Sequence, residues 1–171
     1  MEIPRTRNVI VLTQDLTFPV MVDAAMARNG WPGGQGVTWA ASTSDNFVVT
    51  YSDGTYGGFL LWGSDEPADQ YISMTRNQPT YRFGVACFGT WVISTVAYER
   101  YTLQSRLTPP LVPNTFSVGA RLQFSLRGLF TPEDEWTIAA DPRAPNPYFI
   151  GSVIQAPVNQ NNFQLMVQTA I

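Results

Sequence analysis

Apolar and polar residues alternate along 116–127, FSVGARLQFSLR. Successive side chains of a strand point to opposite faces, so the alternation predicts a strand that buries the row from Phe116 to Leu126. The other row is polar and holds only two charged residues, Arg121 and Arg127. In an extended strand these arginines lie about 20 Å apart on one outward face.

Further strands are expected at 8–14, 47–51, 57–62, 70–75, 80–88, 90–104, 148–155 and 163–171. A helix is the alternative for 90–104, but its density of β-branched and aromatic residues favours a strand. Asp53-Gly54 is a strong hairpin signal, which predicts that 47–51 pairs directly with 57–62. The proline-rich segment 107–114 cannot form a central strand or a helix, because proline lacks an N–H donor and fixes the backbone, and 141–147 is predicted to be another proline-rich connector.

One short helix is expected near residues 19–28. Thr17 is the predicted cap, Pro19 lies in the first turn and Gly30 follows the end. With many strands, many turns and no alternation of strands with helices, the chain is predicted to be all-β. We expect an antiparallel β-sandwich or barrel, with a jelly roll as one candidate topology. Residues 1–7 are expected to form an N-terminal arm and 8–171 a single β-domain.

The charge content excludes some classes of function. Only 13% of the 171 residues are charged, all ten basic side chains are arginine, and the net charge is -3. Nucleic-acid binding is not expected without a basic cluster. No apolar run is long enough for a membrane span, and the first residues do not match a signal peptide. We therefore expect a protein made in the cytoplasm, without membrane contact.

The absence of histidine and lysine excludes several chemistries. There can be no Ser-His-Asp triad, Schiff-base lysine or phosphate-binding P-loop lysine. The lone Cys87 allows no internal disulfide and is expected to be a core strand residue. Glu99 is the best candidate for carboxylate chemistry but has no evident partner. The acidic turn 65–69 matches no EF-hand, so no catalytic, cofactor or metal-binding residue is predicted.

Low charge with arginine, tyrosine and glutamine favours surfaces that other proteins cover. The residues predicted to form protein interfaces lie in the arm, in 116–127 and in the last strand. They are Arg5, Arg7, Arg121, Gln123, Arg127, Gln164 and Gln168.

A compact β-domain with an arm, proline-rich crossovers, few charges and no catalytic constellation resembles the small structural proteins of tailed-bacteriophage particles, such as head decoration or cement proteins and tail components. The resemblance implies a non-enzymatic virion protein that binds copies of itself, often as a trimer, and a capsid or tail lattice. One alternative is a carbohydrate-binding β-sandwich that uses exposed tryptophan and tyrosine. Another is a glycoside hydrolase that uses Glu99.

Overall fold

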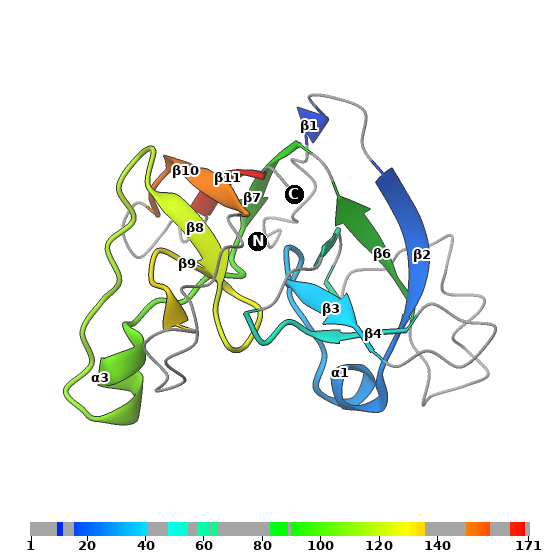
Figure 1. Ribbon diagram of the computed structural model, residues 1–171, viewed down its shortest axis with the longest axis horizontal. Coiled ribbons are helices and arrows are strands. Elements are labelled where there is room, and N and C mark those ends of the chain that lie inside the picture. Colours follow the sequence, from blue (N-terminus) through cyan, green and yellow to red (C-terminus); the bar gives the residue numbers. More distant parts are fainter. Residues whose placement is uncertain are drawn as a thin grey trace, which may run out of the picture.

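The protein is mostly β, with two sheets and few short helices (Figure 1). The computed structural model describes residues 10–11, 16–40, 48–54, 58–61, 63–64, 83–88, 90–135, 150–157 and 165–169. The predicted β class is confirmed. In the described part of the chain, no helix is long and apolar enough to cross a membrane.

The first sheet has six strands, and every neighbouring pair is antiparallel. Its order is β1 (Ile10–Val11), β7 (Trp91–Thr95), β11 (Leu165–Thr169), β10 (Gly151–Gln155), β8 (Arg121–Phe124) and β9 (Phe130–Thr131). Ile93 of β7 lies opposite Val167 of β11, and both side chains are buried. Leu122 and Phe124 of β8 and Val153 of β10 are buried in the same core, so one face of the sheet is packed.

The second sheet has five strands in the order β3 (Val37–Trp39), β4 (Val48–Tyr51), β2 (Leu16–Val22), β6 (Phe83–Phe88) and β5 (Phe59–Leu60). β2 and β4 are parallel, so the sheet is mixed and the purely antiparallel expectation is wrong here. The reason lies in the connection, because the chain crosses through a helix and β3 between β2 and β4.

The predicted hairpin at Asp53-Gly54 is also wrong in its pairing. Gly54 has a left-handed φ of 96°, as a tight turn requires, but β5 pairs with β6 and not with β4. Phe59 packs edge-on against Trp91 of the first sheet, with ring centroids 6.2 Å apart. β5 is thus an edge strand of its own sheet whose Phe59 ring packs into the core of the six-stranded sheet.

The helix α1 (Ala24–Asn29) is shorter than expected and begins later. Asp23 caps it, since its Oδ1 accepts a hydrogen bond of 2.8 Å from the Met26 N–H. Thr17 and Pro19 belong to β2, where Pro19 lies opposite Val85. Both Val20 and Val22 are buried, and this spacing of two is the strand period, which prevails over the local helix-start signal.

A second short helix, α3 (Leu103–Leu107), was not expected. It interrupts the predicted strand 90–104, of which only β7 is a strand. Thr102 caps α3 by accepting a hydrogen bond of 3.3 Å from the Ser105 N–H. The Thr102 cap and the burial of Leu103 thus favour a helix here, despite the strand tendency of the β-branched residues that precede it.

The strand predicted at 116–127 is confirmed only at β8. Gly119 lies in a turn with a φ of 82°, and Val118, expected in the core, is 73% exposed. The chain turns again after Phe124, where Gly128 has a φ of 72°. Arg121 and Arg127 are therefore not on one strand face, because the alternation continues in the sequence beyond the ends of the strand.

Two apolar cores lie side by side. One is built on the six-stranded sheet with Phe59 added, and the other lies between α1 and the five-stranded sheet. Backbone hydrogen bonds join the sheets, including one of 2.7 Å from the Gly36 N–H to the Gly128 carbonyl. A Cβ at Gly36 would lie 2.5 Å from the Phe124 ring, so only glycine permits this close approach.

Candidate functional site

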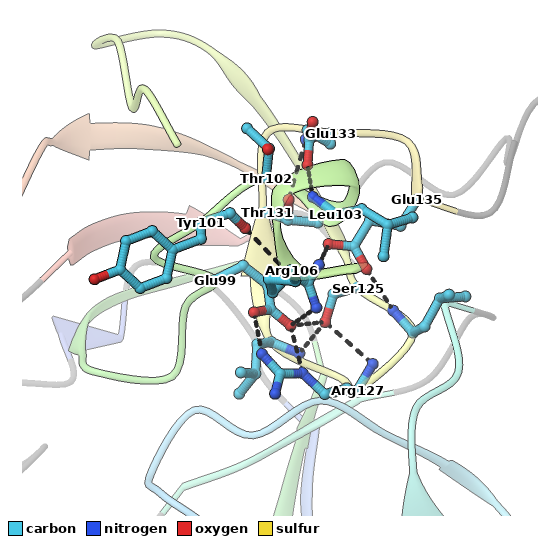
Figure 2. Close-up of polar contacts among 12 residues, drawn as sticks. Glu99, Tyr101, Thr102, Leu103, Arg106, Ser125, Arg127, Thr131, Glu133 and Glu135 are labelled. Atoms are coloured by element: carbon cyan, nitrogen blue, oxygen red, sulfur yellow. Dashed lines mark hydrogen bonds and ion pairs between the residues drawn. The ribbon is translucent and has the colours of Figure 1, made fainter. Parts of the chain in front are cut away.

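Two buried glutamates and two arginines form the most concentrated polar group in the described residues. We call Glu99, Arg106, Ser125, Arg127 and Glu135 the Arg–Glu cluster, and Figure 2 shows it at the base of α3. Both carboxylates are fully buried, whereas the Arg127 side chain is 60% exposed. The formal charges of two arginines and two glutamates cancel.

Glu99 accepts hydrogen bonds at both carboxylate oxygens. Its Oε1 accepts from Ser125 Oγ at 2.8 Å, from Arg127 Nε at 3.0 Å and from Arg106 Nη1 at 3.3 Å. Its Oε2 accepts from Arg127 Nη2 at 2.5 Å. The two-point contact with Arg127 is the geometry in which a guanidinium binds a carboxylate most strongly. This hydrogen bonding to Glu99 raises the pKa of Arg127.

Glu135 is the second carboxylate of the Arg–Glu cluster. Its Oε1 pairs with Arg106 Nη2, and its Oε2 accepts a hydrogen bond of 3.1 Å from the Leu126 N–H. Burial raises the pKa of Glu135, and these two contacts oppose that effect by stabilising the charged form. The charges of Glu99 and Glu133 raise the pKa further. Removal from water is the dominant influence on this group.

Backbone pairing places Glu99 beside the turn that carries its partners. The Glu99 N–H donates to the Phe130 carbonyl at 2.9 Å, and the Phe130 N–H donates to the Ala97 carbonyl at 2.8 Å. Residues 97–99 thus run alongside β9. Ser125 and Arg127 lie in the turn that joins β8 to β9, so the same turn faces the Glu99 carboxylate.

α3 brings Arg106 to the carboxylates. Glu133 Oε2 accepts a hydrogen bond of 2.9 Å from the Leu103 N–H at the start of this helix. Arg106 lies in the last turn of α3 and contacts both Glu99 and Glu135. It is therefore the one member of the Arg–Glu cluster that comes from α3, and it ties this helix to the β8–β9 region.

The Arg–Glu cluster is suited to holding chain segments together. Each carboxylate is buried and already accepts hydrogen bonds from an arginine and a second donor. In a glycoside hydrolase, the general acid must hold a proton close to the glycosidic oxygen, and the nucleophilic carboxylate must reach the sugar carbon. Glu99 is the residue considered for glycoside hydrolysis, and Glu135 is the second carboxylate that sequence analysis did not find. Arg106 contacts both carboxylates and so joins the two glutamates.

From the last residue of α3 onward the chain forms an exposed apolar segment, residues 107–113, which we call the projection. Leu107 is 71% exposed, Leu111 53% and Val112 50%. In Figure 1, α3 and the following segment lie at the outer edge of the six-stranded sheet, away from the five-stranded one. Contiguous exposed apolar side chains on a folded protein indicate a contact surface.

The base of the projection is closed by hydrogen bonds. The Thr102 N–H donates to the Val112 carbonyl and the Asn114 N–H to the Arg100 carbonyl, each at 2.9 Å. The Asn114 side-chain amide adds a hydrogen bond of 3.0 Å to the Glu99 carbonyl. The chain leaving the projection is thus held against residues 99–102, which include Glu99 of the Arg–Glu cluster.

The structure separates the predicted interface residues. Arg121 and Gln168 are exposed and lie in one row of the six-stranded sheet, each opposite Ser152 of the strand between them. Gln123 is half-buried on β8, and Arg127 belongs to the Arg–Glu cluster. The other three predicted interface residues, Arg5, Arg7 and Gln164, lie outside the described residues. The acidic turn 65–69 also lies outside them.

Sequence reasoning missed the exposed apolar side chains and the second glutamate. The proline-rich composition of 107–114 identified a connector that could reach a neighbour, but did not show that Leu107 and Leu111 remain in solvent. No local signal links Glu135 to Glu99, because the two approach each other only through tertiary packing. A scan against protein-family models found no match, and searches of curated proteins and solved structures found none of significance.

Proposed function

We propose that the chain is a non-enzymatic structural protein of a viral particle of the bacteriophage type. In this proposal it binds copies of itself and stabilises a capsid or tail lattice. The projection is the observation that carries the proposal, since Leu107, Leu111 and Val112 are held in solvent on a closed base. A segment that is ordered before it meets a partner loses little conformational freedom on binding.

The low charge of the neighbouring surface supports the same function. Arg121 and Gln168 form a polar row with Ser152 on the exposed face of the six-stranded sheet. Val118 and Ile154 add exposed apolar side chains beside this row, where the Gly119 N–H binds the Val153 carbonyl. Arginine and apolar side chains with few acidic groups are the usual composition of interface cores.

We further propose that residues 8–171 form one sandwich-type or barrel-type β-domain and that residues 1–7 reach a neighbouring subunit. Contacts between β3 and β5, the two edges of the five-stranded sheet, support a curled form. Gly36 bridges Phe59, and the Val37 N–H donates to the Gly58 carbonyl at 2.9 Å. An edge that is paired in this way leaves fewer backbone groups open to unwanted strand pairing.

The mass of the purified chain in solution tests the proposal. Sedimentation should show an oligomer, or a chain that co-sediments with particles of its source. Replacing Leu107 and Leu111 with serine should abolish this association without lowering the unfolding midpoint, because both side chains are exposed. The matched control replaces Ala24 and Ala25, exposed residues of α1, with serine. A wild-type monomer that binds no particle would refute the proposal.

Trp39 supports a second candidate, a carbohydrate-binding module. It is 44% exposed on β3, whereas Trp31 and Trp91 are buried in the two cores. An exposed indole can stack on the apolar face of a sugar. Titration with oligosaccharides should then change the tryptophan fluorescence of the wild type, and the change should vanish in Trp39→Ala. The hydrolase alternative is weaker, because Glu99 is buried against two arginines.

A further inference from the structure

The segment 100–114, which contains α3 and the projection, lies outside both apolar cores. The rings of Tyr98 and Phe116, on either side of it in the chain, pack edge to face in the core with centroids 5.3 Å apart. Neither core includes a residue between these two rings, although the structure describes all of them. Leu103 is the only buried apolar side chain of the segment. We call 100–114 the strap, because both of its ends are fixed and the part between them lies outside the cores.

Polar contacts hold the strap against the rest of the domain. Arg106 contacts Glu99 at 3.3 Å and also pairs with Glu135, and both carboxylates are fully buried (Figure 2). The Leu103 N–H donates to Glu133 Oε2 at 2.9 Å. Each of these contacts ends on a glutamate carboxylate. Since Leu103 is the only apolar side chain that the strap buries, its attachment depends on Arg106 more than on the hydrophobic effect.

The hydrogen bonds at the base of the strap allow it to move as one unit. The Thr102 N–H donates to the Val112 carbonyl and the Asn114 N–H to the Arg100 carbonyl, each at 2.9 Å. Both bonds join one limb of the strap to the other, so they can remain when the strap leaves the domain. α3 has only five residues, and helices shorter than about 12 residues are marginal without packing. The hydrogen bonds inside α3 are therefore expected to break on opening.

We propose that the strap opens as a unit while both sheets stay folded, and that Arg106 is the residue that holds it closed. Segments with few buried apolar contacts open locally, at a lower free energy than global unfolding. Opening moves Leu107 and Leu111 of the projection away from their fixed base. The loss of the contact surface on opening is a consequence that rests on the proposed function. The opening itself does not depend on that function.

Amide hydrogen exchange of the full wild-type chain tests the opening. The strap amides are those of Leu103, Arg106 and Thr108, and the body amides are those of Phe130 and Val153, all of which donate hydrogen bonds. After correction for intrinsic rates, the strap amides should exchange at least about tenfold faster than the body amides. Low urea should accelerate the body amides more, because global unfolding exposes more surface than strap opening. Equal rates with equal urea dependence would overturn the inference.

Substitutions separate strap opening from global unfolding. Ile93→Val removes a methylene group from the core of the six-stranded sheet and leaves the strap contacts intact. It should accelerate the body amides by about two- to tenfold and leave the strap amides within about twofold of the wild type. Acceleration of both sets by the same factor would overturn the inference, because the strap would then open only by global unfolding.

Arg106→Gln should accelerate the strap amides by at least about tenfold, because it removes the contacts with both buried carboxylates. The matched control is Arg127→Gln, since Arg127 contacts the same Glu99 but lies outside the strap. The control should leave the strap amides within about twofold of the wild type. Unchanged strap exchange in Arg106→Gln would overturn the role of Arg106. If this variant does not fold, the urea series and Ile93→Val still decide the inference. None of these results bears on the proposed function, which the mass in solution tests separately.

Discussion

Replacement of Glu99 by glutamine tests the Arg–Glu cluster most directly. The change keeps the shape of the side chain and removes one buried negative charge. Glu99 Oε1 then loses or weakens its hydrogen bonds from Arg106, Ser125 and Arg127. The new amide group also places donors against the Arg127 guanidinium, which itself can only donate.

The magnitude follows from the burial of each partner. Removing one member of a buried ion pair typically costs about 3–5 kcal/mol, because the other charge is left without compensation. Here Arg127 is 60% exposed and can turn into water, and Arg106 keeps its contact with Glu135. The loss in the free energy of unfolding should therefore lie at or below the lower end of this range, at about 2–4 kcal/mol.

Urea unfolding followed by tryptophan fluorescence measures this loss, provided that the slope with urea stays equal to that of the wild type. The matched control is Glu133→Gln, because Glu133 is half-buried and its amide can still accept the hydrogen bond from the Leu103 N–H. The control should lie within about 0.5 kcal/mol of the wild type. An equally small effect for Glu99→Gln would show that the Arg–Glu cluster does not stabilise the fold.

Burial and backbone conformation predict the effects of three other changes. Burial raises the pKa of Glu135 in the folded state. Its contribution to stability is therefore fully present below the ordinary pKa of 4.5 and is lost as the pH rises through the folded pKa. Urea midpoints measured across this pH range should show that Glu135→Gln removes this part of the pH dependence. Gly128→Ala should destabilise more than Gly119→Ala, because both have positive φ but only the Cβ at 128 would lie 2.5 Å from the Gly36 carbonyl oxygen; equal thermal midpoints would contradict this. Leu122→Ala, in the core, should cost about 2–5 kcal/mol in urea unfolding, whereas Leu107→Ala on the projection should change stability by no more than about 0.5 kcal/mol.

The strand content and the turns could be predicted from local pattern. The alternation at β4 and β6 reflects the two-residue period of a strand, and Gly54 permits the positive φ of a turn. Both features depend on neighbouring residues alone. The predicted helix near 19–28 was wrong in its first half because two local signals disagreed there. The strand period of Val20 and Val22 competed with a cap signal, and burial in the sheet decided between them.

The sequence by itself excluded reactions that need a histidine or lysine of this chain, because folding cannot supply a side chain that is absent. Tertiary structure decided what the remaining residues do. It made β2 a parallel neighbour of β4, and it joined Glu99 to Glu135 through Arg106. It also left Leu107 in solvent and buried Leu103, although both are leucines of one short helix. Such pairings depend on contacts between residues far apart in the chain, which no local period encodes.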